Sequence, residues 1–136
     1  MIHPWTTSLV GTWLLAVSTS APLAAAEPLR PTRLRCEYLE NPLGIEDTSP
    51  RVSWQVTSAE RGQRQTACRI LVASHPDKLA ANEGDLWDSG KVASDQTVNV
   101  VYAGKPLTSR TTCHWSVQVW DQAGDPGAWS EPAHWS

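Results

Sequence analysis

The stretch Cys113-His-Trp-Ser-Val-Gln-Val-Trp-Asp121 decides the fold class of this chain. Apolar and polar residues alternate along it, which is the period-two pattern of a β-strand that buries one of its faces. The residues predicted to point inward are Cys113, Trp115, Val117 and Val119. Trp120 has the opposite parity, so we expect its side chain to point outward. The stretch therefore predicts a half-buried strand with a tryptophan on each face.

The same alternation, with turn residues on either side, indicates six further short strands. They are expected at residues 32–39, 52–56, 68–72, 86–90, 98–102 and 128–135. Trp54 is predicted to share an inward face with Val52 and Val56. Pro132 lies in the last strand, where it is tolerable only at a sheet edge. Seven short strands without a long helix predict an all-β chain, a single antiparallel two-sheet sandwich of the immunoglobulin-like, fibronectin type III-like class.

The N-terminal segment is predicted to be a secretory signal peptide. Residues 1–26 contain no Asp, Glu, Lys or Arg, and residues 9–17 form a short apolar run. Small residues stand at −3 and −1 before Glu27, as cleavage after Ala26 requires. The segment lacks the usual Lys or Arg before the apolar run, which leaves a transmembrane anchor as the alternative. Against that alternative, the run is shorter than the roughly 20 apolar residues needed to span a bilayer.

This segment determines the expected domain organisation and location. We expect residues 1–26 to be a signal peptide, 27–32 a short linker and 33–136 the sandwich. The mature chain would then be exported, to the periplasm or the extracellular space, with no stable membrane span. Its 11 basic and 14 acidic residues are interspersed and sum to a net charge of −3. No basic block or stripe is present, which argues against nucleic acid as a partner.

The three cysteines are predicted to remain unpaired. Cys68 and Cys113 each open a strand, and antiparallel pairing of those strands would put the two cysteines at opposite ends. Their separation would far exceed the roughly 7 Å Cα limit for a disulfide. Cys36 is expected in the other sheet, and the three spacings fit no zinc pattern.

Seven strings, taken in order, carry a family resemblance. They are Leu34-Arg-Cys-Glu-Tyr-Leu-Glu-Asn-Pro-Leu-Gly-Ile45, Pro50-Arg-Val-Ser-Trp54, Arg61-Gly-Gln-Arg-Gln-Thr-Ala67, Arg69-Ile-Leu-Val-Ala73, Leu86-Trp-Asp-Ser-Gly-Lys-Val92, Leu107-Thr-Ser-Arg110 and Trp115-Ser-Val-Gln-Val-Trp-Asp121. In this order and spacing they resemble the N-terminal β-sandwich of bacterial α-L-rhamnosidases, glycoside hydrolase family 78. The resemblance covers essentially the whole predicted mature chain. It departs from the family pattern at Cys68 and Cys113, where tyrosine is expected.

The resemblance implies an inverting hydrolase that removes terminal α-L-rhamnose, with catalytic carboxylates in an (α/α)6 barrel several hundred residues downstream. No position of this chain matches those carboxylates, so no catalytic, cofactor-binding or metal-binding residue is carried over. The resemblance implies the downstream catalytic domain of the same parent as partner, and rhamnosides only through that parent. Inversion needs two carboxyl groups about 6.5–9.5 Å apart. The acid pairs in the sequence (46/47, 85/88 and 121/125) all fall in predicted turns, where acids cap the backbone.

Tryptophan is the residue type that suggests a contact surface, with eight copies and no phenylalanine in the chain. Trp5 and Trp13 lie in the predicted signal peptide, and Trp54 and Trp115 are expected in the core. Three remain as a candidate domain-docking surface: Trp120, Trp129 and Trp135. The last two differ by six positions and are predicted to share a face. An exposed tryptophan either stacks on a sugar ring or is covered by a neighbouring domain, and both readings stay open.

Two functions of different class follow. The first is a non-catalytic N-terminal structural module, in this form a fragment, of a secreted α-L-rhamnosidase that hydrolyses terminal α-L-rhamnosides. The second is a free-standing extracellular carbohydrate-binding or adhesion module. An autonomous enzyme is the weakest reading, because the chain shows no convergent polar cluster that would form a pocket. His75, His114 and His134 show no paired metal-ligand spacing.

Overall fold

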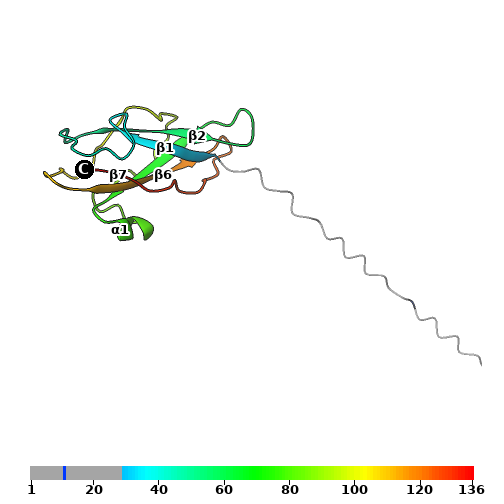
Figure 1. Cartoon of the computed structure of the whole chain (residues 1–136). Helices are drawn as coiled ribbons and strands as arrows, with labels where there is room; N and C mark the ends of the chain where they lie inside the picture. The colour runs from blue at the N-terminus through cyan, green and yellow to red at the C-terminus, as the bar shows by residue number, and fades with distance from the viewer. Residues whose placement is uncertain (1–10, 12–28) are drawn as a thin grey trace, which may run out of the picture.

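Two antiparallel sheets pack face to face in a computed structural model that describes Gly11 and residues 29–136 (Figure 1). The three-stranded sheet has the order β1-β2-β5, with β1 at Arg30–Cys36, β2 at Arg51–Thr57 and β5 at Val100–Val101. The four-stranded sheet has the order β4-β3-β6-β7, with β4 at Trp87–Asp88, β3 at Ala67–Ala73, β6 at Cys113–Trp120 and β7 at Ala133–Trp135. The predicted all-β, seven-stranded sandwich is confirmed. The predicted signal peptide lies outside the described residues, apart from Gly11.

The pair formed by β3 and β6 is the centre of the sandwich. The two strands stay in register over seven residue pairs, from Ala67 opposite Trp120 to Ala73 opposite His114. The four β6 residues predicted to point inward are all buried to 1% exposure or less. Cys68 and Cys113 lie at opposite ends of the pair, and Cys36 lies in the other sheet, as expected.

The core contains an aromatic cluster between the sheets. Trp54 and Trp115 are 2% and 1% exposed, which confirms both as core residues. The ring of Trp135 meets that of Trp115 edge-on at 6.1 Å and that of Tyr102 at 6.0 Å, an arrangement that aromatic rings favour. The indole N–H of Trp54 donates to Gln65 Oε1 at 3.0 Å, so this buried donor is satisfied.

The first and last strands differ from their predicted bounds. β1 starts at Arg30, so it includes residues 30–32, which the sequence assigned to a linker. It ends at Cys36, because Glu37 and Tyr38 adopt φ of 49° and 66° and turn the chain. β7 comprises only Ala133–Trp135, since Pro132 has no N–H to donate. Ahead of it, Ser130 holds the chain to β6 by accepting from Val117 N and donating to Val117 O.

The short helix α1, at Pro76–Ala80, is capped differently from the sequence pattern. Ser74 with Asp77 three residues later resembles an N-cap signal. In the structure His75 is the N-cap and makes no side-chain capping bond. Ser74 Oγ donates instead to Asp85 Oδ2 at 2.6 Å. The helix packs on the outer side of β3 through Leu79.

The three cysteines are free and buried, as predicted. Burial raises the pKa of the Cys36 thiol to about 12 and that of Cys113 to about 11, and it also raises the pKa of Cys68. Reaction at sulfur needs the thiolate, so these side chains behave as small apolar core residues.

Candidate functional site

Trp135 does not belong to a surface. It is 2% exposed and lies in the main core, which corrects its assignment to the docking surface. Trp129 is half-buried and packs on a second cluster with Leu71, Ala73 and Leu79, on the outer side of the four-stranded sheet. The two tryptophans therefore lie on opposite sides of that sheet. The prediction that both tryptophans share a face assumed one continuous strand. The chain between them is not one strand, because it is bonded to β6 at Ser130 and interrupted at Pro132.

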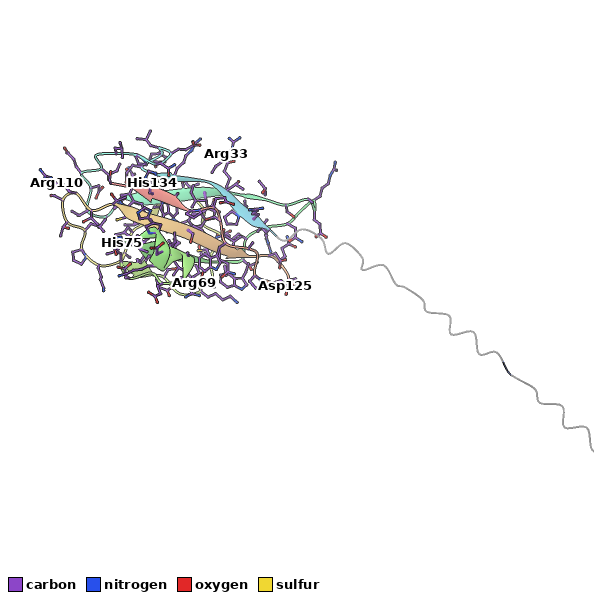
Figure 2. The ribbon with its side chains drawn as sticks, turned by 60° about the horizontal axis from the view of Figure 1, so that its bottom comes forward. Arg33, Arg69, His75, Arg110, Asp125 and His134 are labelled. Carbon is purple, nitrogen blue, oxygen red and sulfur yellow. The ribbon has the colours of Figure 1, made fainter. Side chains whose placement is uncertain are left out.

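Trp120 and Trp129 face outward but are partly covered by cations of the same chain. The ammonium of Lys91 lies 5.0 Å from the ring centroid of Trp120, and the guanidinium of Arg69 lies 5.7 Å from that of Trp129. Asp88 holds Arg69 in place through two bonds of 3.0 and 2.8 Å. Arg69 lies on the side of the sandwich that carries α1 (Figure 2). Both indoles thus have intramolecular partners, and a docking role for them stays a prediction.

The acidic residues of the predicted turns bind backbone and cations. Asp47 accepts from Ser49 N, and Asp121 accepts from the N–H groups of Ala123 and Asp125, each at 2.9–3.0 Å. Where a carboxyl pKa departs from its ordinary value in the described residues, it is lowered, at Glu37, Asp85 and Asp88. A glycosidase general acid needs a raised pKa, so none of these three groups fits that role.

Asp85 shows how the turn acids act. Burial alone would raise the pKa of its carboxyl, but bonds from Ser74 N, Ser74 Oγ and Lys78 Nζ at 2.9, 2.6 and 3.2 Å outweigh burial and lower the pKa to about 2. The carboxylate connects the end of β3 to α1 and to the loop before β4. Its role in the described structure is therefore structural.

The pH dependence of stability tests this role. A lowered pKa in the folded state stabilises the fold at pH values above the unfolded pKa, and that contribution is lost as the pH falls from about 4 towards 2. We expect Asp85→Asn to lower the free energy of unfolding by about 1–2 kcal/mol at pH 6 and by much less at pH 2.5. Urea unfolding of the whole chain at both pH values measures this. Asp95→Asn, at an exposed position, is the control, and an Asp85→Asn loss that does not depend on pH would contradict the assignment.

The structure describes three histidines, His75, His114 and His134. His114 and His134 are direct neighbours across β6 and β7, with ring centroids 6.2 Å apart. Burial, then the nearby His134 and His75, lower the pKa of His114. Within the described residues no group of three or more His, Cys, Asp or Glu side chains is arranged to hold a metal ion. No helix in that same part of the chain is long and apolar enough to cross a membrane.

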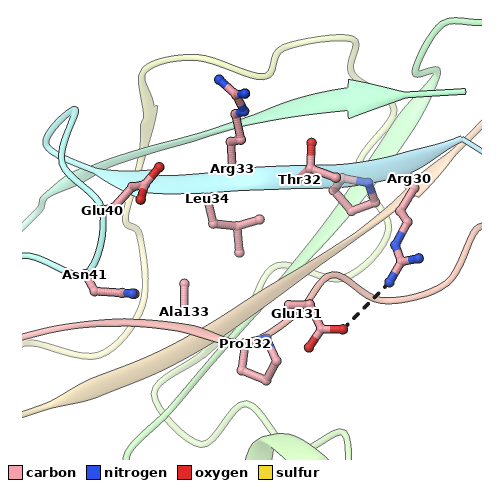
Figure 3. A pocket seen from close by; sticks show the side chains of 10 residues that line it. Arg30, Thr32, Arg33, Leu34, Glu40, Asn41, Glu131, Pro132 and Ala133 are labelled. Atoms are coloured by element: carbon pink, nitrogen blue, oxygen red, sulfur yellow. Dashed lines mark ion pairs between the residues drawn. The ribbon is translucent and has the colours of Figure 1, made fainter.

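A groove between the free edges of β1 and β7 has a volume of about 400 Å³ and is lined by two carboxylates that the sequence did not connect (Figure 3). Glu40 and Glu131 line it from opposite ends, as the figure shows. Both side chains are exposed, at 66% and 89%, and each faces an arginine: Arg35 at 3.9 Å and Arg30 at 3.7 Å. The carboxylates of this groove are therefore exposed to solvent and paired with cations of the same chain.

The sequence of residues 31–136 matches the family described as Rha78A-like, N-terminal immunoglobulin domain. The chain belongs to this family. The match covers almost all of the described sandwich, from the second residue of β1 to the C-terminal Ser136.

The relatives of this Rha78A-like immunoglobulin domain include proteins named α-L-rhamnosidase. An α-L-rhamnosidase of Streptomyces avermitilis is 48% identical over 107 residues, which is 79% of this chain and 10% of that protein. Its crystal structure with L-rhamnose superposes with a TM-score of 0.75 over the same share of each chain. The α-L-rhamnosidase structure from Dictyoglumus thermophilum gives a TM-score of 0.76 at 34% identity, over 78% of this chain and 12% of that one. An α-L-rhamnosidase of Alteromonas sp. (strain LOR) is 39% identical over 125 residues, 90% of this chain and 13% of that protein. This chain therefore spans about a tenth of the length of the relatives that it matches.

Proposed function

We propose that this chain is the non-catalytic N-terminal structural module of an exported α-L-rhamnosidase. The observation that carries the proposal is the small share of each relative's length that this chain matches. The chain is 48% identical to the Streptomyces avermitilis α-L-rhamnosidase, but it covers only 10% of that protein. That tenth is the immunoglobulin-like domain, and its acidic residues bind turns and cations rather than facing a reaction site. The module supports the catalytic region by packing on it and positioning it.

The finer points of the proposal concern the parent protein. We propose that it removes terminal α-L-rhamnose with inversion, using carboxylates of an (α/α)6 barrel beyond this module. Export by the segment 1–26, with cleavage after Ala26, belongs to the same proposal. The names of the relatives support the removal of rhamnose, the family resemblance of the sequence supports inversion and the barrel, and the composition of residues 1–26 supports export.

Two assays of the purified whole chain test the non-catalytic assignment. We expect no release of the aryl alcohol from an aryl α-L-rhamnoside above the blank, with the Streptomyces avermitilis enzyme as positive control. We also expect L-rhamnose to leave the tryptophan fluorescence unchanged, because a cation of the chain itself already contacts the ring of Trp120 and that of Trp129.

Either assay has an outcome against the proposal. Hydrolysis that is abolished by Glu131→Gln or Glu40→Gln would make the groove of Figure 3 an active site. Saturable quenching that is lost in Trp120→Ala would make the chain a carbohydrate-binding module.

A further inference from the structure

The turn that follows β1 exposes an unusual amount of apolar surface. Leu43 is 80% exposed, Leu39 57% and Tyr38 53%, which are the three largest values among the exposed large hydrophobic residues of the described chain. They fall within six consecutive residues, at one end of the sandwich. Clustered apolar exposure of this kind marks an interaction surface, whereas single exposed apolar residues need no explanation.

This turn is held in a fixed conformation by bonds to three strands. Cys36 and Leu39 exchange both backbone bonds, at 2.9 and 3.0 Å. Glu37 accepts from the backbone and guanidinium of Arg51, at the start of β2. Asn41 Oδ1 accepts from His134 N in β7 at 3.0 Å. Leu39 and Leu43 are therefore presented on an ordered backbone, which lowers the entropic cost of binding a partner.

The last strand of the sandwich ends against the same turn. Ser136 N donates to Pro42 O at 3.1 Å, and Ile45 N donates to Ser136 O at 2.7 Å. Leu43 lies in the chain between Pro42 and Ile45, the two residues that bind Ser136. A polypeptide that continues beyond the last strand therefore leaves the module beside Leu43. Figure 1 places the C-terminus at this end of the sandwich and the start of β1 at the other.

A hollow of about 550 Å³ adjoins the turn on the other side of Ser136. Ile45, Leu107 and Trp135 contribute apolar lining, and Glu46 and Arg110 contribute charge. Figure 2 shows Arg110 at the outermost part of this end. Two exposed leucines beside a hollow that is lined by both apolar and charged side chains fit a domain interface, which combines apolar and polar surface.

The outward-facing Trp120 lies far from this exit. Trp135 pairs with Cys113, the first residue of β6, whereas Trp120 is the last residue of that strand. Seven steps along a strand correspond to about 23 Å. A domain that begins just after Ser136 meets Leu39 and Leu43 before it reaches Trp120.

We propose that Leu39, Leu43 and the adjoining hollow are the surface on which the next domain of a full-length α-L-rhamnosidase docks through an apolar patch. This inference rests on the proposed function. The relatives supply the argument for the occupant, because about nine tenths of each lies outside a region whose family is named N-terminal.

A chimera tests the surface. The whole chain replaces the matched region of the Streptomyces avermitilis enzyme, and the double variant Leu39→Ser/Leu43→Ser is compared with Val92→Ser/Val98→Ser. The control valines are 43% and 48% exposed and lie outside the turn and the hollow. We expect the leucine variant to lower the thermal midpoint of the chimera by about 2–4 °C. The control variant should leave the midpoint unchanged. Neither variant should change the midpoint of the free chain, because all four side chains are exposed.

Hydrogen exchange gives a second readout, which reports on the turn itself and not on the whole chimera. Amides of residues 38–47 are expected to exchange more slowly in the chimera than in the free chain. Two results together would overturn the docking surface and leave the proposed function standing. The leucine and valine variants would have equal thermal midpoints, and the amides would exchange equally fast in the chimera and in the free chain. A chimera no more stable than the enzyme without any module would overturn the proposed function itself.

Discussion

Replacing Trp115 with alanine is expected to lower the free energy of unfolding by about 3–5 kcal/mol, the usual loss for a large aromatic removed from a core. Trp115 is 1% exposed, at the middle of β6, and its ring meets the edge of Trp135 at 6.1 Å. The cavity would open between the two sheets, beside the ladder of seven residue pairs that joins β3 to β6. Domains of this size have a total stability of about 5–15 kcal/mol, so the variant is expected to be marginally folded.

The matched control is Trp120→Ala in the same strand. Trp120 is the same residue type with the opposite parity, half-buried, and its main partner is the ammonium of Lys91 at 5.0 Å. A cation–π contact of this kind contributes about 0.5–1 kcal/mol. Urea unfolding followed by circular dichroism compares the two variants. Equal losses would show that the inward and outward faces of β6 were assigned wrongly.

Strand parity made the centre of the fold predictable. The alternation of Cys113–Asp121 correctly placed four inward residues of β6, and Val52 and Trp54 of β2 followed the same rule. Parity is a local property of an unbroken strand, so it holds wherever the ladder is continuous. It failed between Trp129 and Trp135, where Ser130 and Pro132 interrupt the strand and move Trp135 into the core.

The contacts missed by the sequence are non-local. Ser74 resembled a helix cap, but its partner is Asp85, a residue in the loop before β4. Glu40 and Glu131 line the same groove only because β1 and β7 lie at neighbouring edges of different sheets. The sequence placed Leu39 at the end of the strand predicted at 32–39, so it did not predict an apolar turn that contains both Leu39 and Leu43. Its position beside the chain exit depends on the bonds between Ser136 and residues 42 and 45.

The second large effect is expected in a full-length α-L-rhamnosidase. Removing the matched region from the Streptomyces avermitilis α-L-rhamnosidase is expected to lower its thermal midpoint by several degrees and to speed its irreversible inactivation. A docked domain stabilises its neighbour because the interface is lost whenever either part unfolds. Interfaces between domains of one chain bury about 600–1,500 Å², which is large enough for such coupling. Fusing the present chain in place of the missing region is expected to recover most of the loss, since the two modules are 48% identical.

The thermal midpoint of this replacement chimera tests the structural-module assignment most directly. The required comparison includes the intact enzyme, the truncated enzyme, the chimera and a chimera that carries Trp115→Ala. The account predicts a low midpoint for the truncated enzyme, a restored midpoint for the chimera and a low one again for the Trp115→Ala chimera, whose module is poorly folded. A truncated enzyme as stable as the intact one, or a Trp115→Ala chimera as stable as the unmodified chimera, would contradict it.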